Sequence, residues 1–392
     1  MRWNWQQPDW PNFAWAPALL VNAEAMFLRG TGVLAGASKH LDQAAHDQVL
    51  AETLSLEAVT TSEIEGEMLD RASVQSSIQK HLGISTERRR VGPAEQGISD
   101  LMVNLYRGIN VPLSHDTLFL WHQMVMSGRS DLRDVGRYGS SAGPMQVVSG
   151  PIAARKIHFE APPSVRVKKE MAAFLQWFKA TAPGSADELP ALTRAGIAHL
   201  YFESIHPFED GNGRLGRAIA EKALVQGFGQ PVIIAFARTV LAHHRAYYAA
   251  LEAANKQNNV NDWLRWFAAI AIEAQHRTLS LIEFVIHKTK LLDAVREHIN
   301  ERQQKVLLRM LREGPEGFQG GMTAKKYAAI AGTTPATTTR DLAGLVDAGA
   351  LTRSGELKST RYALNIPSAK VQSVSISKDG EVRLILPYRT TD

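Results

Sequence analysis

The stretch that decides the fold is residues 206–217, which read HPFEDGNGRLGR. A helical pattern ends near His206, a glycine-rich turn follows, and a second helical pattern begins near Gly213. The stretch contains the spacing G-x-G-x-x-G, but a dinucleotide-binding loop with that spacing follows a strand and has an acidic residue about 20 positions later. Here the preceding segment is helical, and residues 233–240 contain no acid. The sequence therefore favours a helix, a turn and a second helix over a dinucleotide-binding loop.

The residue types in this stretch suit a phosphate site. A glycine-rich turn that opens a helix directs free backbone N–H groups and the helix dipole toward an anion. Arg214 and Arg217 are three residues apart, share a face of the new helix, and can both hold phosphate oxygens. Asp210 offers a hard oxygen ligand for Mg²⁺, and His206 can accept a proton near neutral pH. Together they predict a base, a metal ligand and an anion cradle around one phosphate.

The same string resembles the signature of the Fic family, His-Pro-Phe-x-Asp/Glu-Gly-Asn-Gly-Arg-x-x-Arg, at every defined position. The resemblance implies transfer of AMP from ATP to a Tyr, Thr or Ser hydroxyl of a target protein, or of the chain itself. It also implies that His206 deprotonates the attacking hydroxyl and that Asp210 holds Mg²⁺ at the α- and β-phosphates. Members of the family carry a hairpin, the flap, ahead of the active site, and residues 145–159 would form it here.

The resemblance assigns the other contacts of ATP as well. Asn212 would support the α-phosphate together with the backbone of Gly211 and Gly213. Arg214 would bind the phosphate tail and Arg217 the γ-phosphate. These roles agree with the general chemistry of phosphoryl-type transfer, which depends mostly on positioning and charge stabilisation.

Two residues further along the chain would complete the nucleotide site. Tyr248 and Asn255 lie seven apart on a later helical segment and resemble the positions that enclose adenine in relatives. Ordinary helix packing and a polar helix end are the alternative roles for this pair. Relatives also make a homodimer a possible assembly.

An upstream stretch, residues 61–66, reads TSEIEG and looks like the inhibitory motif of the family, Ser/Thr-x-x-x-Glu-Gly or Asn. Thr61 and Glu65 are four apart on one helical face, and Gly66 would end the helix. A helix docked beside the nucleotide site would direct Glu65 at Arg217, in the place of the γ-phosphate. Some relatives remove AMP instead, using the equivalent of Glu65 to position a water. The sequence leaves AMP transfer and AMP removal both open.

Composition narrows the class of protein. The chain has 392 residues, a net charge of +5 and no cysteine, which excludes disulfides, thiolate metal sites and cysteine nucleophiles. No stretch approaches the roughly 20 apolar residues of a membrane span, so we expect a soluble cytoplasmic protein without a membrane partner. Residues 1–80 hold five Lys and Arg against ten Asp and Glu, whereas the remainder is basic. An acidic N-terminal region docked on a basic core would explain this asymmetry.

The pattern of elements predicts a mainly α protein in three parts. Residues 1–93 form a helical region with a tryptophan-rich start, 94–292 a Fic helical core with its hairpin flap, and 293–392 a winged helix-turn-helix with a terminal hairpin. The tryptophan-rich start, residues 3–11, also looks like the N-terminal segment of Fic proteins whose inhibitory helix precedes the core.

A second hypothesis makes the chain a DNA-binding regulator in which the Fic-like core senses a nucleotide. Three helical patterns followed by two short strands give the order of a winged helix-turn-helix. The residues expected to face DNA are Thr337, Thr338 and Arg340 in the major groove, with Arg353, Lys358 and Arg361 on the wing. The intact motif at 206–217 favours the enzyme over the regulator.

Overall fold

The computed structural model describes residues 2–39, 41–84, 89–150, 155–228, 234–314, 317–318, 320–367 and 371–385. The chain folds into two compact units. The first comprises Met1–Lys39, Leu50–Thr278 and Gln372–Asp392, and the second His40–Val49 and Leu279–Val371. The predicted mainly helical fold, with a helical core and a small hairpin ahead of the motif, is confirmed.

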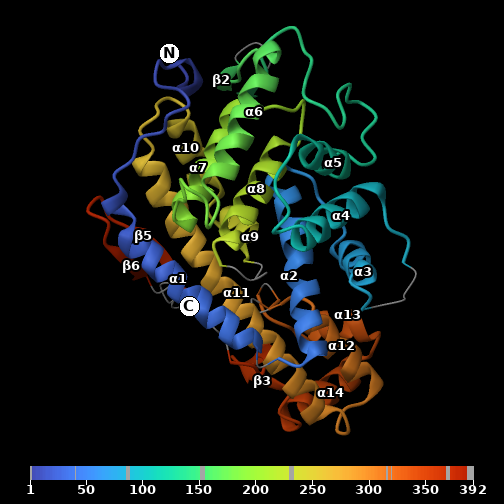
Figure 1. Cartoon of the computed structure of the whole chain (residues 1–392). Coiled ribbons are helices and arrows are strands. Elements are labelled where there is room, and N and C mark those ends of the chain that lie inside the picture. The colour runs from blue at the N-terminus through green and yellow to red at the C-terminus, as the bar shows by residue number, and fades with distance from the viewer. Residues whose placement is uncertain are drawn as a thin grey trace. The chain divides into compact units, whose positions relative to one another are not determined.

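Helices make up most of the first unit, together with the hairpins β1–β2 and β5–β6 (Figure 1). Its helices are α1 (Val21–Lys39), α2 (Gln43–Ile64), α3 (Arg71–His81), α4 (Pro93–Arg107), α5 (His115–Val125), α6 (Ser164–Ala180), α7 (Ala191–Ile205), α8 (Asn212–Gln226), α9 (Phe236–Ala242), α10 (His244–Ala254) and α11 (Asn261–Val295). The first residues of α2 and the last residues of α11 belong to the second unit.

Local sequence signals explain where several helices begin. Asp70 caps α3 by accepting a hydrogen bond from the Ser73 N–H at 3.0 Å, and Ser114 caps α5 in the same way through Thr117. Pro93 occupies the first turn of α4, where its missing N–H costs nothing. These caps fix the direction in which each helix enters the unit.

The core of the first unit is centred on α7, which is buried along its whole length. Helix α8 packs beside α7 and is buried along most of its length (Figure 1). Phe208, in the loop between them, is fully buried as well. Because both helices are fixed by core packing, the loop 206–211 that joins them is held in one place.

Helix α1 forms although Gly30, Gly32 and Gly36 lower its intrinsic helix propensity. One of these glycines has a packing role. A Cβ at Gly30 would overlap the side-chain amide of Gln275 on α11. That amide donates hydrogen bonds of 2.9 Å to the Phe27 carbonyl and to the Thr31 hydroxyl. The close approach of α1 to α11 therefore stabilises a helix whose composition is unfavourable.

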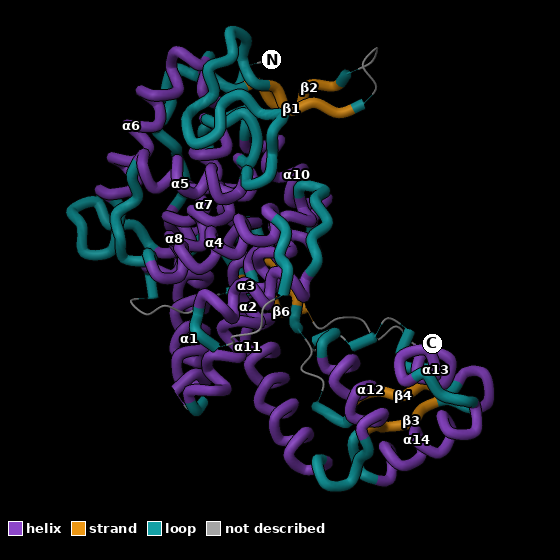
Figure 2. Tube along the Cα trace, turned by 90° about the vertical axis from the view of Figure 1, so that its right-hand side faces the viewer, coloured by secondary structure: helices purple, strands orange, loops and turns teal. Residues whose placement is uncertain are grey.

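The predicted flap is an antiparallel hairpin of β1 (Gln146–Ser149) and β2 (Lys156–Glu160) (Figure 2). Val147 pairs with Phe159, and the register shifts by one residue immediately after this pair. Every residue of β1 is exposed, and Phe159 is the buried residue of β2. Pro151, in the loop expected between the strands, lies outside the described residues.

A second hairpin, β5 (Ser373–Ile376) and β6 (Val382–Ile385), also belongs to the first unit. The Asn22 side chain donates to the Gly380 carbonyl at 3.3 Å, and Arg265 donates to the Ile376 carbonyl at 3.2 Å. These bonds attach the hairpin to α1 and α11. Leu386, expected to end its second strand, lies outside the described residues.

The second unit contains α12 (Glu301–Leu311), α13 (Ala324–Ala331), α14 (Pro335–Asp347) and the hairpin β3 (Leu351–Ser354) with β4 (Arg361–Leu364). This order matches the expected one, while the winged-helix assignment stays a prediction. One expected DNA contact is corrected: Thr338 is 1% exposed, and its hydroxyl bonds to that of Thr333 at 2.9 Å. Arg340 and Arg353 are exposed. In the part of the chain that the structure describes, no helix combines the length and the apolar character needed to cross a membrane.

Candidate active site

The loop of the motif begins at His206, which follows α7 directly and has a φ of 49°. A left-handed conformation is costly for a residue with a Cβ, and it turns the chain sharply out of the helix. Gly211, with a φ of 81°, takes the same conformation where α8 begins. A Cβ there would lie 2.8 Å from Met126. Glycine is therefore required at this turn for both backbone and space.

Asn212 closes the loop from within. Its Oδ1 accepts from the Phe208 N–H at 3.0 Å, and its Nδ2 donates to the Phe208 carbonyl at 2.8 Å. The Asn212 side chain is thus used by the loop itself. Any support that this residue gives to a phosphate would come from its backbone.

His122 on α5 holds the other side of the loop. Its ring stacks on Phe208 with centroids 4.2 Å apart and planes at 12°. The Gly136 N–H donates to Nδ1 at 2.9 Å, so Nε2 carries the proton and faces the Asp210 carbonyl at 3.2 Å. Burial lowers the pKa of His122, which keeps this ring neutral. A neutral ring in a fixed tautomer anchors the loop at Asp210.

The charge state of His206 suits a base. Burial lowers the pKa of the His206 imidazole to about 4, so the ring is neutral at physiological pH. Its Nδ1 lies 3.8 Å from Glu203 Oε2 on α7. Burial, helped by the charge of Glu65, raises the pKa of Glu203 to about 8, so this carboxyl is protonated near neutrality. With Nδ1 turned to Glu203, Nε2 is the nitrogen left to accept a proton.

Arg217 is 2% exposed and is bonded by the end of α2. Its NH2 lies 2.8 Å from Glu65 Oε1 and 2.8 Å from the Thr61 carbonyl. Its Nε donates to the Thr61 hydroxyl at 2.8 Å. The structure therefore brings together the three residues that the spacing of the two motifs suggested. Helix α2 ends at Ile64, and Gly66, with a φ of 82°, turns the chain immediately after Glu65.

Arg214 meets a second carboxylate from the same segment. Its NH1 donates to Glu67 Oε2 at 2.6 Å, and its NH2 lies 3.6 Å from Asp210 Oδ1. Burial lowers the pKa of Arg214, although Glu67 and Asp210 act against that effect. Sequence reasoning missed Glu67. The available signal was the repeat of acids at every second position through Glu63, Glu65 and Glu67.

Buried donors in this cluster remain unpaired. Within the described ranges, Arg217 NH1 and Arg214 Nε are buried and have no hydrogen-bond partner. Buried polar groups without partners are rare, and each calls for an explanation, such as a catalytic role or a bound water or ion. The two guanidinium groups therefore keep free donors even with Glu65 and Glu67 in place.

Asp210 is the candidate metal ligand, and its donor chemistry fits Mg²⁺. Its side chain is 38% exposed, and Arg129 holds its Oδ2 at 2.9 Å while Asp131 holds Arg129 from the other side. Among the described residues, no three His, Asp or Glu side chains gather in a group that could hold a metal ion. A single exposed carboxylate suits Mg²⁺, which takes one or two carboxylates and draws its other ligands from phosphates and water. Arg129 is a second residue that the sequence analysis did not single out.

A cavity of about 540 Å³ lies beside the motif. Its lining includes Glu65, His206, Gly213, Tyr248 and Asn255. The two residues proposed for adenine therefore face the same space as the motif. The Tyr248 hydroxyl donates to the Ile64 carbonyl at 3.5 Å, which links α10 to the inhibitory segment.

The flap forms another wall of this cavity. Val148 and Phe159 line it, and His158 Nδ1 lies 2.8 Å from Glu252 Oε2 on α10. Hydrogen bonds from His158 and Lys256 lower the pKa of Glu252 to about 2, so its carboxylate is ionised. The hairpin is thereby attached to the helix that carries Tyr248.

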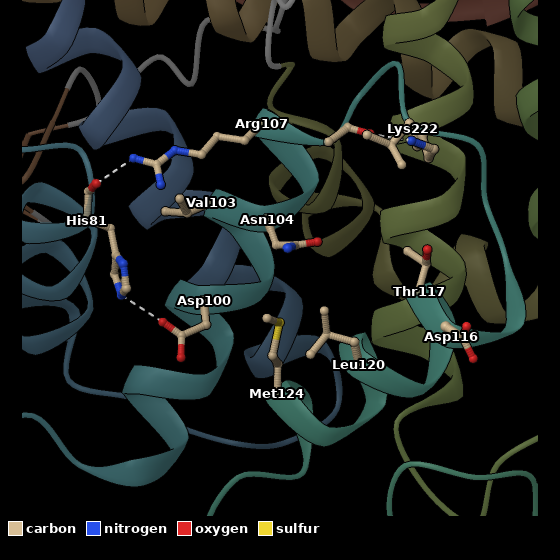
Figure 3. A pocket seen from close by; sticks show the side chains of 12 residues that line it. His81, Asp100, Val103, Asn104, Arg107, Asp116, Thr117, Leu120, Met124 and Lys222 are labelled. Atoms are coloured by element: carbon tan, nitrogen blue, oxygen red, sulfur yellow. Dashed lines mark hydrogen bonds and ion pairs between the residues drawn. The ribbon is translucent and has the colours of Figure 1, made fainter.

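A second cavity, of about 650 Å³, lies between α4 and α5 (Figure 3). Several of its polar groups are bonded to one another or to the backbone. His81 bonds Asp100 at 2.7 Å, Arg107 donates to the His81 carbonyl at 2.6 Å, and Lys222 donates to the Gly108 carbonyl at 2.7 Å. Among the described residues, none of the buried side-chain atoms without a partner lies in the lining of this second cavity, whereas Arg214 and Arg217 of the motif each have one, so the chemistry is expected at the motif.

The comparison with protein families matches residues 112–224 to the Fic/DOC family. The chain contains a Fic/DOC domain. The domain spans α5, the flap and the motif helices α7 and α8. Residues 3–84 match a second family, DUF4172, described as a domain of unknown function. That second match holds both the tryptophan-rich start and the segment from Thr61 to Glu67.

Relatives of the Fic/DOC domain occur among characterised proteins. The chain is 23% identical over 255 residues to protein adenylyltransferase fic-1 of Caenorhabditis elegans, which covers 60% of this chain and 46% of that protein. It is 32% identical over 102 residues to protein adenylyltransferase Fic of Nematostella vectensis, covering 26% and 22%. The chain thus spans less than half the length of these relatives.

A solved structure has the same fold. The Fic family protein from Desulfovibrio desulfuricans G20 superposes with a TM-score of 0.51 at 20% identity, over 90% of this chain and 98% of that one. The likeness extends beyond the Fic/DOC domain, because the match covers far more of the chain than residues 112–224.

Proposed function

We propose that the protein is a protein adenylyltransferase that transfers AMP from Mg-ATP to a hydroxyl side chain of a protein target or of itself. The observation that carries the proposal is the motif itself: His206, neutral and partly buried, lines the cavity together with Glu65, and Glu65 pairs with Arg217. Arg217 and Arg214 each keep an unpaired buried donor in the described residues. The names of the two relatives are in keeping with this reaction.

In the proposed step, His206 Nε2 takes the proton of the attacking hydroxyl. The hydroxyl oxygen forms a bond to the α-phosphorus, the bond from that phosphorus to the bridging oxygen breaks, and pyrophosphate leaves. A neutral imidazole is required at the start, and the lowered pKa of His206 provides it at physiological pH. The turn at φ 49° and the Glu203 carboxyl fix the direction of the ring.

The arginines and the loop bind the phosphates. Backbone N–H groups at the start of α8 would hold the α-phosphate, Arg214 the tail and Arg217 the γ-phosphate. Asp210 would hold Mg²⁺, which offsets negative charge on the phosphates when bound. Tyr248 and Asn255 would enclose the adenine.

Glu65 would inhibit this reaction by occupying the γ-phosphate position on Arg217. The 2.8 Å ion pair with Glu65 and the two hydrogen bonds that Arg217 donates to Thr61 satisfy most of that guanidinium from inside the chain. ATP would then bind with its tail misplaced, so that the α-phosphorus is not aligned for attack.

The test is incubation with α-labelled ATP and Mg²⁺. We expect weak self-labelling of the wild type, a rise of at least about tenfold in Glu65→Gly through realigned phosphates, and no labelling in Glu65→Gly combined with His206→Ala. Glu63→Gln is the matched control, because Glu63 lies two residues from Glu65 without an ion pair in the described structure. Mass spectrometry would identify the modified hydroxyl.

An absence of labelling in a folded Glu65→Gly protein that still binds ATP would contradict the proposal. The same variants distinguish AMP removal. If wild type releases AMP from pre-labelled protein and Glu65→Gly does not, the protein removes AMP by hydrolysis and Glu65 is needed for that reaction.

A further inference from the structure

The structure gives the N-terminal end of the DUF4172 match a role at the active site. Residues 3–10, here called the tryptophan segment, pack against the base of the flap. Trp3 is 8% exposed and meets Phe159 edge to face, with ring centroids 5.4 Å apart. Trp5 donates from its indole nitrogen to the Glu160 carbonyl at 2.6 Å. The segment therefore holds the last two residues of β2.

The flap needs such support. A lone two-stranded hairpin is marginally stable in water, and every residue of β1 is exposed. Phe159 is the one residue of the two strands that is buried, at 3% exposure. The Phe159 ring also lies 6.3 Å from that of His206. Through Phe159, Trp3 thus acts on both the flap and the proposed base.

Asn4 ties the segment to two further parts of the site. It is fully buried, and its Nδ2 donates to the Ser204 hydroxyl at 2.7 Å, two residues before His206. Its backbone N–H donates to the Asn255 carbonyl at 2.7 Å. The Ser204 hydroxyl also lies 3.2 Å from Asn255 Oδ1. Asn4 therefore joins the end of α7 to the end of α10, across the proposed adenine wall.

The segment is itself anchored at its far end. Trp10 donates to Glu170 on α6 at 2.9 Å, and Asp9 accepts from Asn258 at 2.7 Å. The Arg166 guanidinium lies 5.3 Å from the Trp5 ring centroid. Because these contacts fix the segment on the rest of the unit, it can hold the flap in one position.

We propose that the tryptophan segment is a positioning element, which sets the flap, His206 and Asn255 relative to one another. This inference rests on the proposed function for its effect on the reaction. The DUF4172 match would then hold two elements of opposite effect. Residues 3–10 support the productive site, while residues 61–67 occupy its arginines.

The test uses Asn4→Ala and Trp5→Phe in the full chain. Trp5→Phe keeps an aromatic ring and removes the N–H to Glu160. Trp15→Phe is the control, because the Trp15 ring has no hydrogen bond or ring contact in the described residues. Hydrogen exchange at the amides of residues 156–160 is measured without nucleotide, and labelling kinetics are measured in the Glu65→Gly background.

We expect both variants to exchange these amides roughly tenfold faster, as for the loss of about one hydrogen bond. In the Glu65→Gly background we expect kcat for labelling to fall about tenfold through misplaced groups. Trp15→Phe should change neither. Thermal unfolding of each variant separates a local effect from loss of the fold.

Unchanged exchange and unchanged kcat in both variants would overturn the inference while leaving the proposed function intact. If Glu65→Gly fails to label at all, the proposed function fails. The exchange measurement then still decides whether the segment positions the flap.

Discussion

At the scale of single residues, Glu67 forms an ion pair with Arg214, just as Glu65 forms one with Arg217. Each carboxylate bonds a guanidinium that is at most 5% exposed, at 2.6 Å and 2.8 Å. A phosphate chain that takes the positions of Glu65 and Glu67 on the two arginines must displace both carboxylates. The inhibitory segment of this chain therefore contacts both arginines, whereas its motif specifies only the contact of Glu65 with Arg217.

We expect Glu67→Gln to weaken this second contact and to tighten ATP binding. The Glu67 side chain is 35% exposed, so the pair is worth about 1 kcal/mol, or roughly fivefold in Kd. Calorimetric titration with ATP measures this change in Kd. Glu65→Gly and Glu67→Gln combined should bind more tightly than either alone.

Glu63→Gln is again the control, since its carboxylate pairs with neither arginine. Equal ATP affinity in wild type and Glu67→Gln would show that Arg214 is not part of the nucleotide site.

Residue-scale prediction from the sequence succeeded where one motif specifies a spacing and failed where a side chain serves the fold. The spacing from Thr61 to Glu65, together with the resemblance to the inhibitory motif of the Fic family, suggested the contact with Arg217. Glu67 follows Gly66, whose left-handed turn redirects the chain, so helical spacing gave no partner for it. The amide of Asn212 closes its own loop, which a list of motif residues does not reveal.

At the scale of elements, the effect of a glycine on its helix depends on which atoms pack against it. In α4, a Cβ at Gly97 would overlap the Met124 carbonyl and lie 2.7 Å from Ser127. In α1, a Cβ at Gly32 would meet nothing within 4 Å. The same substitution should therefore destabilise one helix and stabilise the other.

We expect Gly97→Ala to lower the free energy of unfolding by about 1–3 kcal/mol, because α4 and α5 must separate. Gly32→Ala should raise it by up to about 1 kcal/mol through helix propensity. Urea unfolding of the two variants measures both. Changes of the same sign in the free energy of unfolding of both variants would contradict the packing described between α4 and α5.

Elements were predictable from the sequence where caps and apolar spacing agree, as for α3, α5 and the flap strands. The bounds of helix α1 are harder to predict, because three glycines lower its intrinsic propensity and contacts with α11 stabilise it. Tertiary contacts of this kind are not visible in the local pattern.

At the scale of the whole molecule, stability should depend on pH through the buried groups around the motif. Burial raises the pKa of Glu203 to about 8 and that of Glu57 to about 7, and it lowers the pKa of His199 and of His206 to about 4. In the folded protein these two carboxyls hold protons that the unfolded chain releases. The free energy of unfolding therefore falls as pH rises. The histidines act in the opposite sense, but only below about 6.5.

We therefore expect the free energy of unfolding to fall as pH rises from 6.5 to 8. Glu203→Gln should reduce this fall by about 1 kcal/mol per pH unit, because it removes one titrating proton. Urea unfolding at several pH values measures the slope. Asp187→Asn, at an exposed acid, should leave the slope unchanged, and an equal slope in Glu203→Gln would contradict a neutral Glu203.

The path of the chain has a practical consequence for dissecting the molecule. The first unit takes its residues from three stretches, and the polypeptide passes between the units at 39/40, 49/50, 278/279 and 371/372. Removing everything after residue 371 would therefore take β5 and β6 from the first unit along with their bonds to Asn22 and Arg265. No single cut yields either unit whole, so separating their activities calls for point substitutions in one unit, with the polypeptide left unbroken.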